Sequence, residues 1–445
     1  MLKYGIITGE VTFMQSIWNE NVEKIKFHPL DGDIKTDVLI IGGGMCGVLC
    51  AYMLKEAGVD CVLVEADRIC SGITNGTTAK ITFQHGLIYD KIIKKYGTHR
   101  ATQYFESQKK ALGKYKTLAE NLDCDFRECN SFVYSLTDQA VIEKEVQAMN
   151  KIGCKAEFSQ TTELPFSVAG AVKVSNQANF NPLKFAYAIS KDLNIYENTK
   201  VLELKPHMAV TNRGTITASK IIVATHFPFI NKHGGYFIKM YQHRSYVIGL
   251  ENAEAVNDMY VDEAKDGLSF RSYGDILLLG GGSHRTGGNG GNWAELERVS
   301  EKYYPDASEV CRWATQDCMT LDSMPYIGQY SKSTHGLYVA TGFNKWGMTS
   351  SMVSAMILTD LVQGRKNEYA DVYSPSRTVL HPQLAVNVFE SVKGLITPTT
   401  PRCPHMGCAL KYNKQEHSWD CPCHGSRFDE GGNLINNPAT DDKSI

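Results

Sequence analysis

The chain has 445 residues, of which 43% are hydrophobic and 21% charged, and its formal net charge is −2. This length is too great for one ordinary core, so we expect two or three domains of a soluble globular protein. The near-neutral charge argues against nucleic acid as a partner, because such a partner requires a basic face.

The 13 cysteines are interpreted as mostly reduced thiols of a cytoplasmic protein. The first 34 residues mix charged side chains among the apolar ones and lack the pattern of a secretory signal. The longest apolar stretch, 38–54, contains three consecutive glycines, whereas a membrane span requires about 20 apolar residues. We therefore expect no membrane span.

A strand–turn–helix pattern opens the first half of the chain. Residues 37–41 are apolar and rich in β-branched side chains, which indicates a buried parallel strand. Gly42, Gly44 and Gly47 follow in the spacing G-x-G-x-x-G, and residues 48–57 have the pattern of a helix. In such a motif the first glycine permits a tight turn, the second lets the backbone approach a pyrophosphate, and the third allows close helix–strand packing. The free N–H groups at the helix N-terminus favour phosphate.

A second strand is predicted over residues 60–64, and it ends at Glu65. A carboxylate at this position accepts hydrogen bonds from ribose hydroxyls and disfavours a 2′-phosphate, so NADP is not expected. Strand, helix, strand and acid occur in the order of a dinucleotide site, which is far more specific than a glycine-rich turn alone.

Two distant strands distinguish FAD from NAD. Residues 220–225 form an apolar strand ending in Ala-Thr, and residues 336–341 form another, followed by a helix over 349–362. With the opening motif and the segment 322–328, they resemble the FAD domain of the D-amino-acid oxidase (DAO) superfamily, which includes glycine, sarcosine and γ-glutamylputrescine oxidases. The resemblance covers roughly residues 15–366 and implies FAD as the cofactor.

The same resemblance implies which residues contact FAD. The helix that begins near Thr349 is expected to direct its positive end at the flavin ring. Some relatives attach FAD through a histidine after the second strand, and no histidine lies between Glu65 and Phe83, so we expect non-covalent FAD. The expected FAD-binding residues are Gly42, Gly44, Met45, Cys46, Gly47, Glu65, Ala66, Thr77, Thr78, Ala79, Lys80, Val201, Ala224, Thr225, Gly342, Lys345, Gly347, Met348 and Thr349.

The middle of the chain is less specific. Residues 97–122 predict a long amphipathic helix of the core or cap. Strands are predicted at 131–136, 244–250, 268–273 and 276–279, and the resemblance implies that they form an antiparallel sheet over the flavin. The glycine-rich segment 280–291 is a hairpin connection or, alternatively, a lid or a docking surface for a second redox group.

Substrate and catalytic candidates come from this sheet and from the last FAD helix. A guanidinium suits bidentate capture of a carboxylate, although for each single candidate a surface salt bridge is the more common role. Lys345 and Trp346 are the catalytic candidates, because hydride transfer to flavin depends on geometry more than on a strong base. The substrate candidates are Arg244, Arg271, Arg285, Tyr246, His243 and His284.

The last fifty residues carry the most specific motif. The segments CPHMGC (403–408) and CPCHGS (421–426) each pair a cysteine with a histidine and add one further cysteine. Two thiolates and two imidazoles bind either a [2Fe–2S] cluster or a zinc ion. A Rieske oxygenase also needs a mononuclear iron site with two histidines and a carboxylate, and the chain has no H-x₄-H pair, so that class is excluded.

The order of these six residues resembles the Rieske family. The resemblance implies that Cys403, His405, Cys421 and His424 bind a [2Fe–2S] cluster, and that a disulfide joins Cys408 to Cys423.

The motif departs from high-potential Rieske sites at one position. Ser426 is present, but Phe428 replaces a tyrosine that bonds a cluster sulfur, so we expect a lowered potential. Only a short proline-rich segment precedes the motif, so a trimmed domain is expected to dock on the FAD domain, with segment 437–439 closing over the cluster.

The sequence therefore predicts an α/β protein with a Rossmann-like FAD domain, an inserted α+β antiparallel-sheet substrate domain and a small all-β Rieske-type domain. The expected boundaries are an N-terminal arm (1–34), the FAD domain (35–96, 170–235 and 320–366), the substrate domain (97–169 and 236–319), a linker (367–400) and the cluster domain (401–445).

The expected function is that of a dehydrogenase. It oxidises a small amine or amino acid by hydride transfer to flavin and passes single electrons through the cluster to a carrier such as a ferredoxin. Two alternatives stay open. The cluster is structural or a redox sensor in a regulatory protein, or electrons flow from the cluster to the flavin.

Overall fold

The computed structural model describes residues 15–230, 233–378, 380–398 and 401–442. The first 14 residues of the expected N-terminal arm lie outside this range. No helix among the described residues is both long and apolar enough to cross a bilayer.

The first sheet has a parallel centre built around the glycine motif. Its strand order is β7-β2-β1-β10-β17, with β16 antiparallel at one edge and the β8–β9 hairpin continuing from β10. The strands are β1 (Ile34–Ile41), β2 (Cys61–Val64), β7 (Ile195–Tyr196), β8 (Val201–Lys205), β9 (Met208–Thr211), β10 (Thr215–Val223), β16 (Tyr326–Gln329) and β17 (Leu337–Thr341).

Both faces of β1 are buried, as its continuous apolar run predicts. Val38 and Ile40 join the large core shared with the helices, while Leu39 and Ile41 join a second cluster with the β8–β9 hairpin. The helices on this side are α1 (Met45–Glu56), α6 (Pro182–Ser190) and α9 (Gly347–Val362), and α1 packs along α9.

The second sheet has nine strands in the order β15-β11-β14-β13-β12-β4-β6-β3, with β5 paired to β6. It is mixed, because β12 runs parallel to β4. The strands are β3 (Lys80–Ile81), β4 (Arg127–Ser135), β5 (Ala156–Ser159), β6 (Gly170–Asn179), β11 (Met240–Glu251), β12 (Met259–Asp262), β13 (Ser269–Tyr273), β14 (Ile276–Arg285) and β15 (Ser308–Thr320).

The remaining helices surround these two sheets. They are η1 (Ile17–Asn19), α2 (Ile73–Gly76), α3 (Tyr89–Tyr96), α4 (Thr98–Ala119), α5 (Gln139–Lys151), α7 (Tyr236–Lys239), α8 (Asn292–Tyr303), α10 (Ala370–Tyr373) and α11 (Pro382–Ile396).

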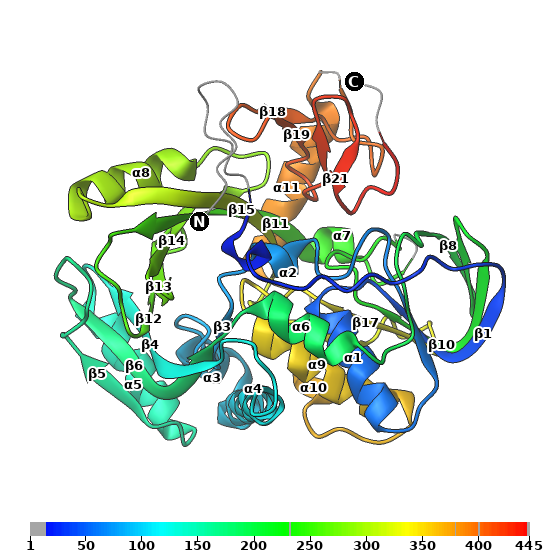
Figure 1. Cartoon of the computed structure of the whole chain (residues 1–445), viewed down its shortest axis with the longest axis horizontal. Helices are drawn as coiled ribbons and strands as arrows, with labels where there is room; N and C mark the ends of the chain where they lie inside the picture. Colours follow the sequence, from blue (N-terminus) through cyan, green and yellow to red (C-terminus); the bar gives the residue numbers. More distant parts are fainter. Residues whose placement is uncertain (1–14, 231–232, 379, 399–400, 443–445) are drawn as a thin grey trace.

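A small antiparallel sheet forms the C-terminal domain, and Figure 1 shows it, in orange and red, at the top of the view with α11. Its strands are β18 (Lys411–Asn413), β19 (Ser418–Asp420), β20 (Arg427–Asp429) and β21 (Leu434–Asn436).

The structure differs from the expected domain arrangement in three places. The segment 170–179 was expected in the FAD domain, but as β6 it pairs with β4 and β5 in the second sheet. The expected antiparallel sheet contains one parallel pair. The expected linker, 367–400, contains the helices α10 and α11.

Candidate active site and cluster centre

A cavity of about 1110 Å³ lies between the first and second sheets. Its lining includes the turn after β1, the ends of β2 and β10, one face of β11, β14 and β15, and the turn between β17 and α9. Carboxyl ends of parallel strands are where open α/β sheets bind ligands. The cavity therefore lies where the expected FAD would bind.

The glycine turn packs closely against its neighbours, with no space for side chains at Gly42 or Gly47. Gly42 has φ +106°, and a Cβ there would lie 2.7 Å from the Ala224 carbonyl oxygen. A Cβ at Gly47 would lie 1.9 Å from the Gly42 oxygen, so α1 sits directly against the turn. Glu65 accepts a hydrogen bond from the Gly43 N–H at 2.6 Å, and burial raises the pKa of its carboxyl. This open N-terminus of α1 fits a pyrophosphate.

Most of the expected FAD contacts line this cavity, and four do not. Gly47, Ala79, Gly342 and Thr349 lie behind its wall; the Thr349 hydroxyl, for example, donates to the Thr82 carbonyl at 3.0 Å. The residues that line it are Gly42, Gly44, Met45, Cys46, Glu65, Ala66, Thr77, Thr78, Lys80, Val201, Ala224, Thr225, Lys345, Gly347 and Met348.

Arg271 supports one wall of the cavity from behind. It is 1% exposed and donates hydrogen bonds to the carbonyls of Thr78 at 2.7 Å and Ala79 at 3.1 Å. Burial, and then the Arg271 charge, lower the pKa of Lys80 to about 7. Arg271 therefore fixes the 78–80 segment and presents no guanidinium to the cavity.

The strands β11, β14 and β15 lie between part of the cavity and the C-terminal domain, and residues of that domain between 434 and 442 also line the cavity. On β11, Tyr241, His243 and Ser245 line the cavity, whereas Gln242 and Arg244 contact the C-terminal domain. This alternation follows from the two-residue period of a strand. Tyr246 departs from this alternation, because it lines the cavity and also donates a hydrogen bond to Glu416.

Two glutamines hold the second cluster loop on this sheet. Gln242 donates through Nε2 to the carbonyls of His424 and Asn437, both at 2.9 Å. Gln316, on β15, donates to the Gly425 carbonyl at 2.8 Å and to the Gln242 side-chain oxygen at 2.6 Å. All four partners are thereby fixed by buried hydrogen bonds.

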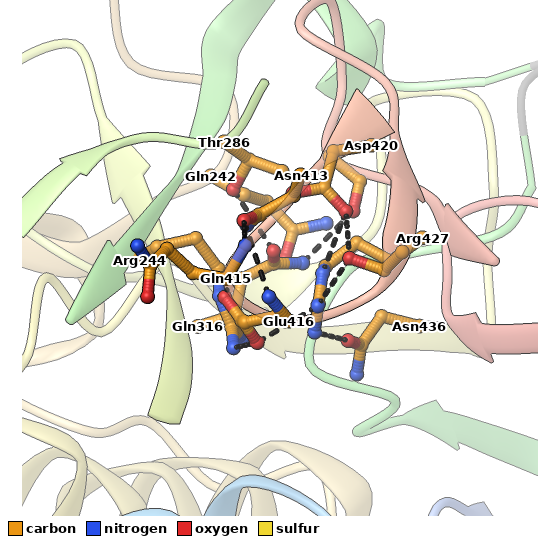
Figure 2. Close-up of polar contacts among 12 residues, drawn as sticks. Gln242, Arg244, Thr286, Gln316, Asn413, Gln415, Glu416, Asp420, Arg427 and Asn436 are labelled. Carbon is orange, nitrogen blue, oxygen red and sulfur yellow. Dashed lines mark hydrogen bonds and ion pairs between the residues drawn. The ribbon is translucent and has the colours of Figure 1, made fainter. Parts of the chain in front are cut away.

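A buried charge network joins the two domains, and Figure 2 shows its side chains meeting at the interface. Arg244 pairs with Glu416 through Nε and Oε1 at 3.0 Å and through Nη2 and Oε2. Glu416 also accepts from Tyr246 at 2.9 Å and from Arg427 at 2.8 Å, and Arg427 binds Asp420 at 2.9 Å. Burial opposes ionisation of Glu416, yet the two arginines hold its pKa below the ordinary value.

Arg285 also contacts the cluster loop. It donates to the carbonyls of Pro422 at 3.1 Å and Cys423 at 3.3 Å, and its guanidinium lies 4.8 Å from the centre of the Tyr241 ring. Arg244, Arg271 and Arg285 were expected to capture a substrate carboxylate. Their guanidinium groups are instead occupied by protein partners, and none of the three lines the cavity.

The remaining candidates lie at or near the cavity. Tyr246 and His243 line it, and His284 bonds the Tyr246 hydroxyl at 3.0 Å. Lys345 lines it and donates to the Ser283 hydroxyl at 3.2 Å, and Trp346 stacks on His85 with ring centres 5.1 Å apart.

Four expected metal ligands converge at the tip of the C-terminal domain. The Nδ1 atoms of His405 and His424 lie 3.3 Å apart, and the side chains of Cys403 and Cys421 are buried beside them. A hydrogen bond from Cys421, opposed by burial, lowers the pKa of the Cys403 thiol to about 7, and the Ser426 hydroxyl adds to the lowering. Two soft thiolates and two imidazoles suit a [2Fe–2S] cluster.

The two ligand loops are tied together by a disulfide between Cys408 and Cys423. Helix α11 packs on it through Gly394, where a Cβ would lie 2.5 Å from the Cys423 sulfur. The two imidazoles differ in setting, because His424 is 2% exposed and His405 is half-buried. The inner imidazole faces the second sheet, and the outer one faces solvent.

Comparisons with known proteins agree with this geometry. The model of the DAO family, "FAD dependent oxidoreductase", matches residues 37–361, and that of the Rieske [2Fe-2S] domain matches residues 364–444. The chain belongs to the FAD-dependent oxidoreductase (DAO) family and carries a C-terminal Rieske domain. It is an oxidoreductase with FAD and a [2Fe–2S] cluster as cofactors, and the fold class predicted from the sequence is confirmed.

The chain is similar to two further proteins in sequence and to a solved structure in fold. It is 32% identical to a putative Rieske 2Fe-2S iron-sulfur protein, YhfW of Bacillus subtilis, over 96% of both chains. It is 25% identical to γ-glutamylputrescine oxidoreductase of Escherichia coli, over 76% of this chain and 86% of that protein. Among solved structures, L-proline dehydrogenase from P. horikoshii superposes with a TM-score of 0.66 at 18% identity, over 78% of this chain and 98% of that one.

Proposed function

We propose that this DAO-family protein is a dehydrogenase that oxidises a small amine or amino acid and delivers the electrons singly, through its Rieske cluster, to an external carrier such as a ferredoxin. When bound, the FAD accepts a hydride and the cluster accepts single electrons. One observation carries the proposal: β11, β14 and β15 line the cavity and also hold the 421–425 loop.

The inner ligand favours electron entry from the sheet side. His424 is buried, its carbonyl is held by Gln242, and its ring lies 6.1 Å from that of Phe237. Arg285 connects the cavity-lining ring of Tyr241 to the Cys423 carbonyl. The cluster loop and the cavity are therefore separated by the thickness of a single sheet, which is a short path for an electron.

The outer ligand supports the choice of an external carrier. His405 is half-buried, and Met406 beside it is 40% exposed. The Met406–Gly407 turn reaches Leu395 at the end of α11, where Ile396 is 74% exposed. An apolar surface continuous with the exposed edge of the cluster fits a protein that docks briefly to receive an electron.

The residues around the cavity have positioning roles in this proposal. The open N-terminus of α1 and Glu65 hold the dinucleotide portion, and the 78–80 segment, fixed by Arg271, supports the flavin side. The N-terminus of α9 brings Lys345 and Trp346 to the cavity wall, where the helix dipole favours negative charge.

An anaerobic titration tests the proposal. The holoenzyme is mixed with glycine, sarcosine, L-proline and putrescine in turn, while flavin absorbance and the electron paramagnetic resonance (EPR) signal of the reduced cluster are followed. A substrate should bleach the flavin and then produce the cluster signal. Flavin bleaching with a cluster that stays oxidised would count for a structural or sensing cluster, and a cluster potential well below that of the flavin would count for the reverse flow.

A further inference from the structure

The cavity wall contains polar residues that take no part in the contacts between the two domains. On β11, His243 is 1% exposed, and among the described residues neither of its ring nitrogens has a hydrogen-bond partner. An acid, Asp266, lies nearby, with its Oδ1 3.8 Å from Nε2 of His243. An unsatisfied buried polar atom is costly, and one that faces a cavity is explained by a ligand that completes it.

Asp317 lies directly opposite His243 on the neighbouring strand β15, and it lines the same cavity. Within the described part of the chain its carboxylate accepts no hydrogen bond and forms no ion pair within 4.0 Å. A carboxylate that forms no hydrogen bond in a desolvated wall can bind a cation from the cavity.

Lys345 supplies the opposite charge from the turn between β17 and α9. Asn344 and Lys345 both have left-handed backbone conformations, with φ +51° and +71°. The Asn344 side chain accepts from the Thr320 N–H at 2.8 Å, which fixes the turn on β15. The Lys345 ammonium reaches into the cavity and donates to the Ser283 hydroxyl.

The two charges line one cavity and attract each other, but among the described residues they form no ion pair within 4.0 Å. A ligand that carries a cation and an anion close together would satisfy both, and the imidazole of His243 beside Asp317 would complete its hydrogen bonds. Apolar side chains of Phe343 and Met319 line the same cavity, and so does the charged Lys265, which acts on both His243 and Lys345.

We propose that Asp317 and Lys345 form the substrate subsite, with Asp317 holding the ammonium group and Lys345 the carboxylate of a small α-amino acid. The proposal rests on the proposed function, because it gives that function its substrate class. It differs from capture by an arginine, since the cavity offers an ammonium in place of a guanidinium.

Binding titrations of the oxidised holoenzyme test it without turnover. Acetate probes the carboxylate half and ethylamine the ammonium half, and the change in the flavin absorbance reports binding of either. The variant Lys345→Met should weaken acetate at least about tenfold and leave ethylamine within about twofold, and Asp317→Asn should do the reverse. Lys345→Arg and Asp317→Glu, which keep the charges, should retain most of the affinity.

Matched controls lie outside the cavity. Lys302→Met on α8 and Asp306→Asn after it change exposed residues of the same types and should leave both affinities unchanged. Each variant must retain the wild-type ratio of flavin to protein, so that loss of folding is not mistaken for loss of binding.

Two results would overturn the subsite: a wild-type flavin spectrum that responds to neither probe, or variants that bind both probes like the wild type. Either result is distinct from failure of the proposed function, because transfer of electrons from the flavin to the cluster is measured separately by photoreduction.

Discussion

Arg244, on the strand that lines the cavity, forms a buried ion pair with Glu416 of the C-terminal domain, and the two side chains are 3% and 7% exposed. Arg427 pairs with the same carboxylate from within the C-terminal domain. A single acid thus links the sheet over the flavin cavity to the domain that holds the cluster. The Glu416 carboxylate is buried between two arginines, so water cannot replace either arginine as its partner. This link therefore fixes the position of the cluster domain.

Replacing Glu416 with glutamine should loosen the cluster domain. The substitution leaves Arg244 as an uncompensated buried charge and leaves Arg427 with Asp420 alone, which costs about 3 kcal/mol or more of stability. Denaturation of the holoenzyme, followed through the visible absorbance of the cluster, measures the loss. The exposed Glu430, which pairs with His417 on the surface, is the matched control, and Glu430→Gln should behave like the wild type. Equal midpoints for both variants would contradict the assigned role of Glu416.

Replacing either of two helical glycines with alanine should change the stability of the protein, in opposite directions for the two positions. In α11, Gly394→Ala places a Cβ against the Cys423 sulfur, so the helix must move off the disulfide and the protein is destabilised. In α4, a Cβ at Gly113 meets no atom within 4 Å, and Gly113→Ala should stabilise by up to about 1 kcal/mol. Thermal unfolding measures the stability of both variants. A stabilising Gly394→Ala would show that α11 does not pack as described.

Removing the Ser426 hydroxyl should lower the midpoint potential of the cluster. The hydroxyl bonds the Cys403 sulfur, and such a bond stabilises the more negative, reduced cluster. Ser426→Ala should therefore shift the potential down by roughly 40 mV, the one-electron equivalent of a hydrogen bond worth about 1 kcal/mol. An EPR-monitored redox titration measures the shift, with Ser391→Ala on α11 as a control of unchanged potential. An unchanged or raised potential in Ser426→Ala would contradict the role of the Ser426 hydroxyl in stabilising the reduced cluster.

Binding of ethylamine should depend on pH through Asp317. Burial raises the pKa of this carboxyl to about 6, so its charged form appears as the pH rises through 6 and is lost as the pH falls. Ethylamine, a cation throughout this range, should therefore bind more tightly at pH 7 than at pH 5. The titration is read from the flavin spectrum, and Asp317→Asn should abolish the difference; a variant that keeps it would assign the dependence elsewhere. The charged and titratable groups around Asp317 are Lys345, Arg244, His243 and, beside Lys345, Asp266 and Lys265.

Local patterns were enough to predict the strands β1, β2, β10 and β17 of the first sheet and the presence of a Rieske domain. The run of apolar residues over 37–41 and the three glycines after it depend only on neighbours in the sequence, and β1 and α1 follow them closely. The same holds for CPHMGC and CPCHGS, where ligand spacing is itself the signal.

The contacts of the second sheet could not be read from the sequence. Residues 240–250 are buried on both faces of β11, so the strand shows no alternation of polar and apolar residues. The sequence suggests Arg244 as a substrate ligand because a guanidinium suits a carboxylate, and it gives no sign of the true partner, Glu416, 172 residues away. Asp317 was missed for the same reason, since only the pairing of β15 with β11 places it opposite His243.

The expected linker shows a further limit. Helix α11 turns Asn387 and Gly394 toward the protein and leaves Phe389 63% exposed and Ile396 74% exposed. Asn387 accepts a hydrogen bond from Arg285 at 3.0 Å, and Gly394 makes room for the disulfide. The face that packs is polar and small, the reverse of the usual amphipathic pattern, so hydrophobic periodicity could not predict how this helix docks.

Laser photoreduction of the flavin in the anaerobic holoenzyme tests the central claim most directly, because it needs no substrate. After the flash, the flavin should be re-oxidised as the cluster is reduced, with one shared rate constant that does not change when the protein is diluted tenfold. A flavin that stays reduced beside an oxidised cluster, or a rate that falls in proportion to protein concentration, would contradict electron transfer across the sheet of β11, β14 and β15.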